Sequence, residues 1–194
     1  MKRTLSIALV LALAAFAASA EKFLGANGSV VRIEGTSTLH AWTMETPAVA
    51  GQINAPTPDN WNAPAKAVVT IPVASIKSEH AKMDKLMAEA LKAKAHPEIR
   101  FEMTSATPRN ASDNAFVLET KGKLTIAGVT RDVAFDVQGS RNADGKYTLA
   151  GHTPIKMSQY GIKPPTAMMG TIKTGDDVKV TFRWVVEKAE ERAQ

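Results

Sequence analysis

The sequence has no cysteine among its 194 residues, and this absence excludes several kinds of site. No disulfide can stabilise the fold, and no thiolate can act as a nucleophile or as a metal ligand. The four histidines show neither the i, i+2 nor the i, i+4 spacing that places two imidazoles on one metal. A Gly-x-Ser-x-Gly nucleophile motif is also missing. We therefore expect no enzyme, no catalytic residue and no metal site.

Aromatic residues and clustered basic charge are scarce as well. Aromatic residues make up 6% of the chain, and its lysines and arginines form no stripe with aromatics between them. The formal net charge of +5 falls to about +3 if Lys2 and Arg3 are removed by processing, because 22 basic residues then face 19 acidic ones. Nucleic-acid surfaces concentrate positive charge and stacking rings on one face. We expect no nucleic-acid partner.

Long apolar runs are absent except near the N-terminus. Lys2 and Arg3 precede an apolar run from Leu5 to Phe16, and the small residues Ala18-Ser19-Ala20 follow it. A basic start, a short apolar core and small residues at the end are typical of a secretory signal peptide. The run is too short to favour a membrane span. The sequence predicts a cleaved signal peptide at residues 1–20 and a single exported domain at residues 21–194.

Most of the remaining chain alternates between apolar and polar residues, which indicates strands with one buried face. The clearest alternation has apolar residues at Val178, Val180, Phe182, Trp184 and Val186. Shorter alternations start at Ile99 and Val133. Further strands are expected at residues 29–34, 40–46, 49–54, 65–72, 116–126 and 146–155. Turns are expected at residues 127–130 and 142–145, where glycine tolerates positive φ.

One segment departs from this alternation. Between Glu79 and Ala93, apolar residues recur at the spacing of an amphipathic helix, with Ser78 as its expected N-cap and Pro97 preventing its continuation. The sequence thus predicts an all-β fold of eight or nine antiparallel strands with one α-helix. So many half-buried strands must close into a barrel or pack as a sandwich. Periodicity alone does not separate the two.

Three segments together resemble the YceI-like family, through their order and spacing. They are Ala95-His-Pro-Glu-Ile-Arg-Phe-Glu102 after the helix, Gly122-Lys-Leu-Thr-Ile-Ala-Gly-Val-Thr130, and Met157-Ser-Gln-Tyr-Gly-Ile162. The resemblance covers about residues 30–186. It implies an antiparallel, lipocalin-like β-barrel of about eight strands with one amphipathic α-helix.

The resemblance also implies a function. Family members are exported barrels associated with polyisoprenoid lipids, so a periplasmic carrier of an apolar isoprenoid lipid or quinone is expected, without any other cofactor. Its partners would be this lipid, at most a transient contact with a membrane surface, and a second copy if the chain forms a homodimer. Ala41 and Gln159 stand where many relatives carry aspartate, and both changes remove charge. No contact with a lipid head group is therefore carried over.

The apolar face of the strands supplies the residues that we expect to line the lipid site. They are Phe101, Met103, Leu118, Leu124, Phe135, Val137 and Trp184, together with Met168 from an apolar loop late in the chain. Thioethers are flexible and suit a lipid entrance, but the same loop could instead plug the barrel. The apolar stripe of the helix is expected to pack over one opening of the barrel.

Two alternatives to a carrier remain at this stage. One is an interaction or stress-response protein whose barrel is packed solid and binds no ligand. The other is an enzyme that uses His40 or His152. Since His40 lies in Thr36-Ser-Thr-Leu-His-Ala-Trp42, we interpret it as a hydrogen-bonding residue of a strand. A continuous cavity would favour the carrier over the packed barrel.

Overall fold

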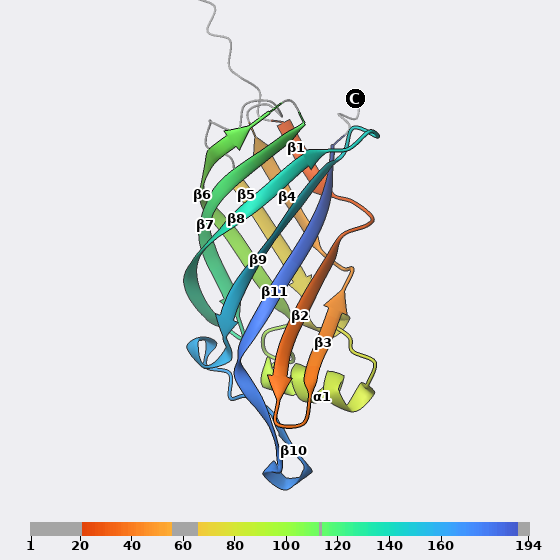
Figure 1. Cartoon of the computed structure of the whole chain (residues 1–194), viewed down its shortest axis with the longest axis vertical. Coiled ribbons are helices and arrows are strands. Elements are labelled where there is room, and N and C mark those ends of the chain that lie inside the picture. Colours follow the sequence, from red (N-terminus) through yellow and green to blue (C-terminus); the bar gives the residue numbers. More distant parts are fainter. Residues whose placement is uncertain (1–20, 56–65, 113, 190–194) are drawn as a thin grey trace, which may run out of the picture.

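The computed structural model describes residues 21–55, 66–112 and 114–189, so the predicted signal peptide lies outside the described residues. Strands dominate this part of the chain (Figure 1). They are β1 (Glu21–Gly25), β2 (Val30–Ser37), β3 (Ala41–Thr46), β4 (Ala50–Ala55), β5 (Lys66–Pro72), β6 (Glu98–Ala111), β7 (Ala115–Ile126), β8 (Val129–Arg141), β9 (Tyr147–Lys156), β10 (Thr166–Ala167) and β11 (Ile172–Lys188). Helix α1 (Ala81–Ala90) and the short 3-10 helices η1 (Val73–Ser75), η2 (Met157–Tyr160) and η3 (Met168–Gly170) connect them.

Eight of these strands form a closed antiparallel barrel. They pair in the order β1, β4, β5, β6, β7, β8, β9 and β11, and the pairing of β1 with β11 closes the ring. The β2–β3 hairpin continues the sheet along β11. The predicted antiparallel barrel of about eight strands with one helix is therefore confirmed.

The two ends of the barrel differ in their pairing. At the end where β1 pairs with β11, the ring closes, but the β5–β6 ladder stops at Val68 and Glu102, and β6 continues to Ala111 paired only with β7. Toward the opposite end, β11 pairs with β2 instead of β1, and the β8–β9 ladder stops at Val137 and Gly151. A bridge between Glu45 and Lys77 connects β3 to the segment after η1. This second end, which carries α1 and β10 in Figure 1, is called the helix end below.

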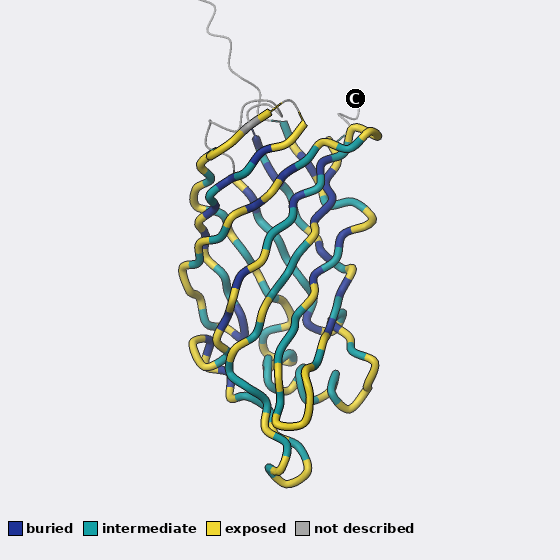
Figure 2. Tube along the Cα trace, viewed as in Figure 1, coloured by how far each residue is buried: buried dark blue, intermediate teal, exposed yellow. Residues whose placement is uncertain are grey.

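The alternation expected from the sequence is present along the strands, as Figure 2 shows by the change of colour from residue to residue. On β11, Val180, Phe182 and Trp184 point to the core, and Lys179 and Arg183 are exposed. The buried residues form two clusters. The larger one includes Phe23, Phe116, Tyr147 and Trp184, and the smaller one gathers Ile126, Ile155, Tyr160 and Ile162 at the helix end.

Helix α1 is shorter than the predicted span of residues 79–93, and its N-cap is His80 instead of Ser78. The backbone N–H and the hydroxyl of Ser78 both donate to Oδ1 of Asp84, at 2.8 and 2.7 Å. The carboxylate in the first turn thus reaches back to Ser78, and the Ser78 hydroxyl accepts from the N–H of His80 at 3.1 Å, just before the first residue of the helix. None of the residues of α1 is fully buried. No helix within the described ranges is long and apolar enough to cross a bilayer.

Candidate functional site

A cavity of about 220 Å³ lies inside the barrel. Strands β2, β4 to β9 and β11 contribute to its wall, together with Ile76, Met157 and Ile162 from connecting segments. Every lining residue is apolar except Thr120 and Thr153. No charged side chain is among them. The cavity therefore suits an apolar molecule and offers no group for acid–base chemistry.

The cavity is long and narrow. On β7 its lining runs from Leu118 to Ile126, and a strand rises about 3.3 Å per residue while tilting by about 35–45° in a barrel. The lined length along the barrel axis is therefore roughly 20 Å. A volume of about 220 Å³ spread over this length describes a tunnel for one chain, not a wide chamber.

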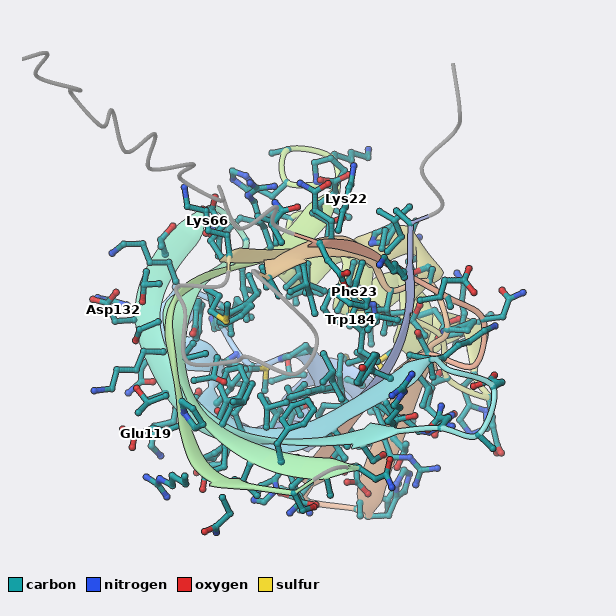
Figure 3. The ribbon with its side chains drawn as sticks, turned by 90° about the horizontal axis from the view of Figure 1, so that it is seen from above. Lys22, Phe23, Lys66, Glu119, Asp132 and Trp184 are labelled. Carbon is teal, nitrogen blue, oxygen red and sulfur yellow. The ribbon has the colours of Figure 1, made fainter. Side chains whose placement is uncertain are left out.

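Aromatic rings lie inside the barrel at two levels. Toward the end opposite the helix end, Phe23 and Tyr147 belong to the buried core and meet edge to face with ring centroids 5.7 Å apart, and Figure 3 shows Phe23 and Trp184 directed into the ring of strands. Further along, Phe135 lies between Phe101 and Phe182, with centroid distances of 5.4 and 5.6 Å. Phe101, Phe135 and Phe182 line the tunnel, and their rings offer edges and faces for packing against a branched alkyl chain.

Seven of the eight residues predicted to contact the ligand line this cavity. They are Phe101, Met103, Leu118, Leu124, Phe135, Val137 and Trp184. They come from β6, β7, β8 and β11 and share the inner face of the sheet. The sequence grouped them because apolar residues recur at every second position of these strands. Whether they contact a ligand stays a prediction.

Met168 does not line the cavity, and this part of the expectation is wrong. Its side chain is 72% exposed, and the neighbouring Met169 is fully exposed. The reason is that β10 pairs with β11 through Thr166–Lys173 and Ala167–Ile172, so the short hairpin between them projects beyond the helix end (Figure 1). The lining residue that this loop region does supply is Ile162, which is 5% exposed.

Most lining residues that the sequence reasoning did not name as such lie on strands, as Ile33, Val69 and Val180 do, and the others lie in segments without strand periodicity. Ile76 follows η1, Met157 begins η2 and Ile162 follows it. In irregular segments, the direction of a side chain depends on distant contacts, so no local pattern could have identified them. Val49 and Ile53 were in a predicted strand, but their face was not assigned.

Charged groups lie on the outside of the barrel and pair with each other. Arg109 contacts Glu119 at 2.8 Å and Asp136 at 3.2 Å. The hydrogen bond to Glu119 raises the pKa of Arg109, and the same bond lowers the pKa of Glu119. Figure 3 shows Glu119 outside the ring of strands. These groups keep the exterior hydrated while the interior stays apolar.

Two buried polar atoms in the wall have no hydrogen-bond partner in the described part of the chain. They are Oγ1 of Thr120 and Nε1 of Trp184. The indole of Trp184 lies against β1, where a Cβ added at Gly25 would be 2.9 Å from Nε1. Both atoms are covered by neighbouring groups, so the surface that faces the tunnel remains apolar.

The histidines occupy the outside of the molecule. His40 is exposed, with Nδ1 2.6 Å from the carbonyl oxygen of Ala41 just before β3 begins. His152 is exposed on β9. Across residues 21–55, 66–112 and 114–189, no group of three metal-ligating side chains lies together. Neither His40 nor His152 lines the tunnel. The candidate site therefore consists of the apolar tunnel alone.

Comparison with known proteins agrees with this geometry. A family model described as a YceI-like domain matches residues 24–186. No curated protein matches the chain. The crystal structure of Burkholderia cenocepacia BcnA is 23% identical, with a TM-score of 0.65 over 81% of this chain and 95% of that chain. A polyisoprenoid binding domain from Saccharophagus degradans, implicated in plant cell wall breakdown, is 14% identical, with a TM-score of 0.68 over 88% and 99%.

A third structure, the YCEI protein of Campylobacter jejuni, is 22% identical, with a TM-score of 0.56 over 76% of this chain and 85% of that chain. At these identities, the three structures show a shared fold and do not identify a ligand.

Proposed function

The chain belongs to the YceI-like domain family, and from this premise we propose that it is a non-enzymatic carrier that holds an apolar, isoprenoid lipid inside its barrel. The observation that carries the proposal is the tunnel, which extends along the barrel and has an apolar lining. A barrel packed solid with its own side chains would favour the ligand-free alternative. The solved polyisoprenoid binding domain with this fold is consistent with the same ligand class.

The driving force follows from the lining. Moving an alkyl chain from water into an apolar environment contributes about 0.8 kcal/mol per CH₂ group. Burial of several isoprene units in the tunnel therefore contributes enough free energy to offset the loss of translational and rotational freedom on binding. The aromatic rings of Phe101, Phe135 and Phe182 add packing partners at mid-tunnel.

We also propose that the carrier works in the periplasm and touches membranes only transiently. The basic start and apolar core of residues 1–20 support export. The projecting hairpin exposes Met168 and Met169, and Thr38 binds this hairpin to the β2–β3 turn, where Leu39 is 66% exposed. These apolar side chains can dip into a bilayer surface without embedding the barrel.

The test is to identify what the protein carries. The protein is expressed with its own export segment, purified, extracted with organic solvent and analysed by mass spectrometry. An isoprenoid lipid in stoichiometric amount is expected. The matched pair is Ala106→Trp, which fills the tunnel, and Ser105→Trp, which adds the same side chain outside on β6. Loss of the lipid in Ala106→Trp but not in Ser105→Trp would support the proposal. A wild-type protein that carries and binds no lipid would overturn it.

A further inference from the structure

A second feature of the barrel wall lies between β8 and β9. From Val137 and Gly151 toward the helix end, the two strands no longer pair with each other. Each remains paired on its other side, β8 with β7 as far as Val129 and β9 with β11 as far as Lys156. The wall is therefore split between two intact ladders. Pro154, within the split, has no N–H to donate across it.

A groove of about 560 Å³ occupies this split. It is lined by Arg131 to Ala134 on β8, by Thr153 to Ile155 on β9, and by Gln159 and Tyr160. Thr153 and Ile155 also line the internal tunnel. The side chains of these two residues lie between the groove and the tunnel, so the two spaces are adjacent across the unpaired stretch of the wall. The groove is called the side groove below.

The side groove carries one cation that no carboxylate neutralises in the described residues. Arg131 is exposed, and its Nε donates to the carbonyl oxygen of Gln159 at 2.9 Å. Asp132, the acidic residue of the groove, is 3.0 Å from Nζ of Lys123. The guanidinium of Arg131 has further N–H groups that can bind an anionic oxygen.

We propose that the side groove is the binding site for the anionic end of a single-chain lipid whose apolar tail occupies the tunnel. The tail passes the inward-facing Thr153 and Ile155, and the head group remains at the surface beside Arg131. This inference rests on the proposed function, since it requires a lipid in the tunnel. It adds the chemical class of the ligand, an amphiphile with a phosphate or similar anionic group. A neutral isoprenoid would use the tunnel alone.

The experiment compares two probes of equal chain length, a prenyl monophosphate and the corresponding prenyl alcohol. Their dissociation constants are measured by titration of the wild-type protein and of Arg131→Gln. The wild type is expected to prefer the phosphate by about tenfold or more, because the guanidinium of Arg131 donates charge-assisted hydrogen bonds to the phosphate and not to the alcohol. Arg131→Gln is expected to lose this preference and to keep its affinity for the alcohol.

Two control variants separate the charge of Arg131 from its structural bond. Arg131→Lys keeps the cation but not the guanidinium bond to Gln159, and it is expected to retain most of the preference. Arg183→Gln removes another exposed arginine that binds a backbone carbonyl, that of Gly28, at 2.6 Å. It is expected to behave as the wild type, because Arg183 lines neither the side groove nor the tunnel.

The passage through the wall is tested by uptake kinetics. Ala134→Trp places a large side chain in the side groove, whereas Gln138→Trp places it on the same outer face of β8 where β8 and β9 are paired. The first variant is expected to slow uptake of the prenyl phosphate by about tenfold or more, and the second to leave it unchanged. Equal rates for both variants, or equal affinity of the wild type for both probes, would overturn the side groove as a head-group site.

These outcomes remain distinct from failure of the carrier function. If the wild type binds both probes equally, the tunnel still binds lipid and only the head-group site is lost. If it binds neither probe, the proposed function itself is contradicted.

Discussion

The hydroxyl of Thr120 is buried in the tunnel wall, and Oγ1 finds no partner among the described residues. A buried hydroxyl without a hydrogen bond costs about 1–3 kcal/mol. Valine has nearly the same shape, so Thr120→Val is expected to raise the free energy of unfolding of the ligand-free protein by about 1 kcal/mol. Chemical denaturation measures the change.

Thr153→Val is the matched control for this variant. Thr153 also lines the tunnel, but its hydroxyl donates to the carbonyl oxygen of Pro154 at 3.4 Å. This variant is expected to be neutral or slightly destabilising. Equal stabilisation by both substitutions would show that the unpaired hydroxyl of Thr120 is not the cause.

Asp84 gives the molecule a pH-dependent contact at the start of α1. The side-chain hydrogen bond from Ser78 lowers the pKa of Asp84 below its ordinary value of 3.8, and the backbone N–H of Ser78 adds to this effect. Because the pKa is lower in the folded state, the contribution to stability is present above the unfolded pKa. It is lost as the pH falls through the folded pKa.

Asp84→Asn is therefore expected to lower the melting temperature slightly at neutral pH and to make no difference below the folded pKa. Melting curves across this pH range, recorded by circular dichroism, test the expectation. A difference between variant and wild type that persists unchanged in acid would contradict it.

At the scale of single residues, the sequence was informative where residues follow a strand. Alternation placed Phe135 and Val137 on the inner face, and both line the tunnel. It gave no information on Met168, because its loop has no periodic pattern and its exposure depends on a hairpin formed with β11. The Ser78 cap was wrong because the helix begins after His80, so the Ser78 hydroxyl accepts from the N–H of His80 and not from an N–H of the first helical turn.

At the scale of elements, close packing between neighbouring strands depends on residues without a side chain. Gly139 on β8 lies opposite Phe116 on β7, and a Cβ added at Gly139 would be 2.0 Å from the ring of Phe116. Gly139→Ala is expected to destabilise the protein by about 1–3 kcal/mol, because the buried ring must shift. Thermal unfolding measures the effect.

Gly175→Ala serves as the control for this substitution. Its added Cβ would meet Oγ1 of Thr36 at 2.9 Å, and that exposed hydroxyl can rotate away. A cost clearly below that of Gly139→Ala is expected. The idea that the Phe116 ring requires glycine opposite it fails if both variants have the same stability.

The projecting hairpin is the second element with a testable role. Met168 and Met169 both have positive φ, at 51° and 54°, followed by Gly170 at 87°. Such conformations are costly for residues other than glycine. They place two thioether side chains in solvent, and Met168→Ser with Met169→Ser is expected to reduce cosedimentation with lipid vesicles severalfold without changing lipid affinity.

Leu24→Ser provides the comparison for the hairpin variant. Leu24 is an exposed apolar residue of β1, at the end of the barrel opposite the helix end. Its substitution is expected to leave vesicle binding unchanged. A similar loss for both variants would indicate unspecific apolar adsorption instead of contact through the hairpin.

The sequence predicted most strands, but not where neighbouring strands separate. The segments at residues 116–126 and 146–155 were expected, and β7 and β9 are close to these bounds. The end of the β8–β9 ladder at Val137 depends on pairing between residues far apart in the chain. Composition and periodicity carry little information of this kind. The side groove was therefore not predictable from the sequence.

At the scale of the whole molecule, three properties act together. The pairing of β1 with β11 closes the sheet of eight strands into a ring. The helix end is split between β8 and β9, while α1 lies there without a buried residue. The tunnel runs inside the ring and has an apolar lining. A closed ring with an apolar interior beside an unpaired stretch of wall fits the proposed carrier function.

The resemblance to a known family supplied the barrel and the ligand class, whereas the residues alone left barrel and sandwich open. Neither the resemblance nor the residue pattern could predict the volume of the interior. Whether inward side chains fill a barrel depends on the tilt of its strands and on the rotamers of rings such as Phe101 and Phe182, which are set only in the folded structure.

The central claim is that the tunnel holds a lipid, and a crystal structure of the protein purified from its own host tests it most directly. The account predicts elongated electron density that follows the tunnel from Trp184 past Phe135 toward Met157. A well-resolved barrel in which the inward side chains close the tunnel and no lipid copurifies would contradict it.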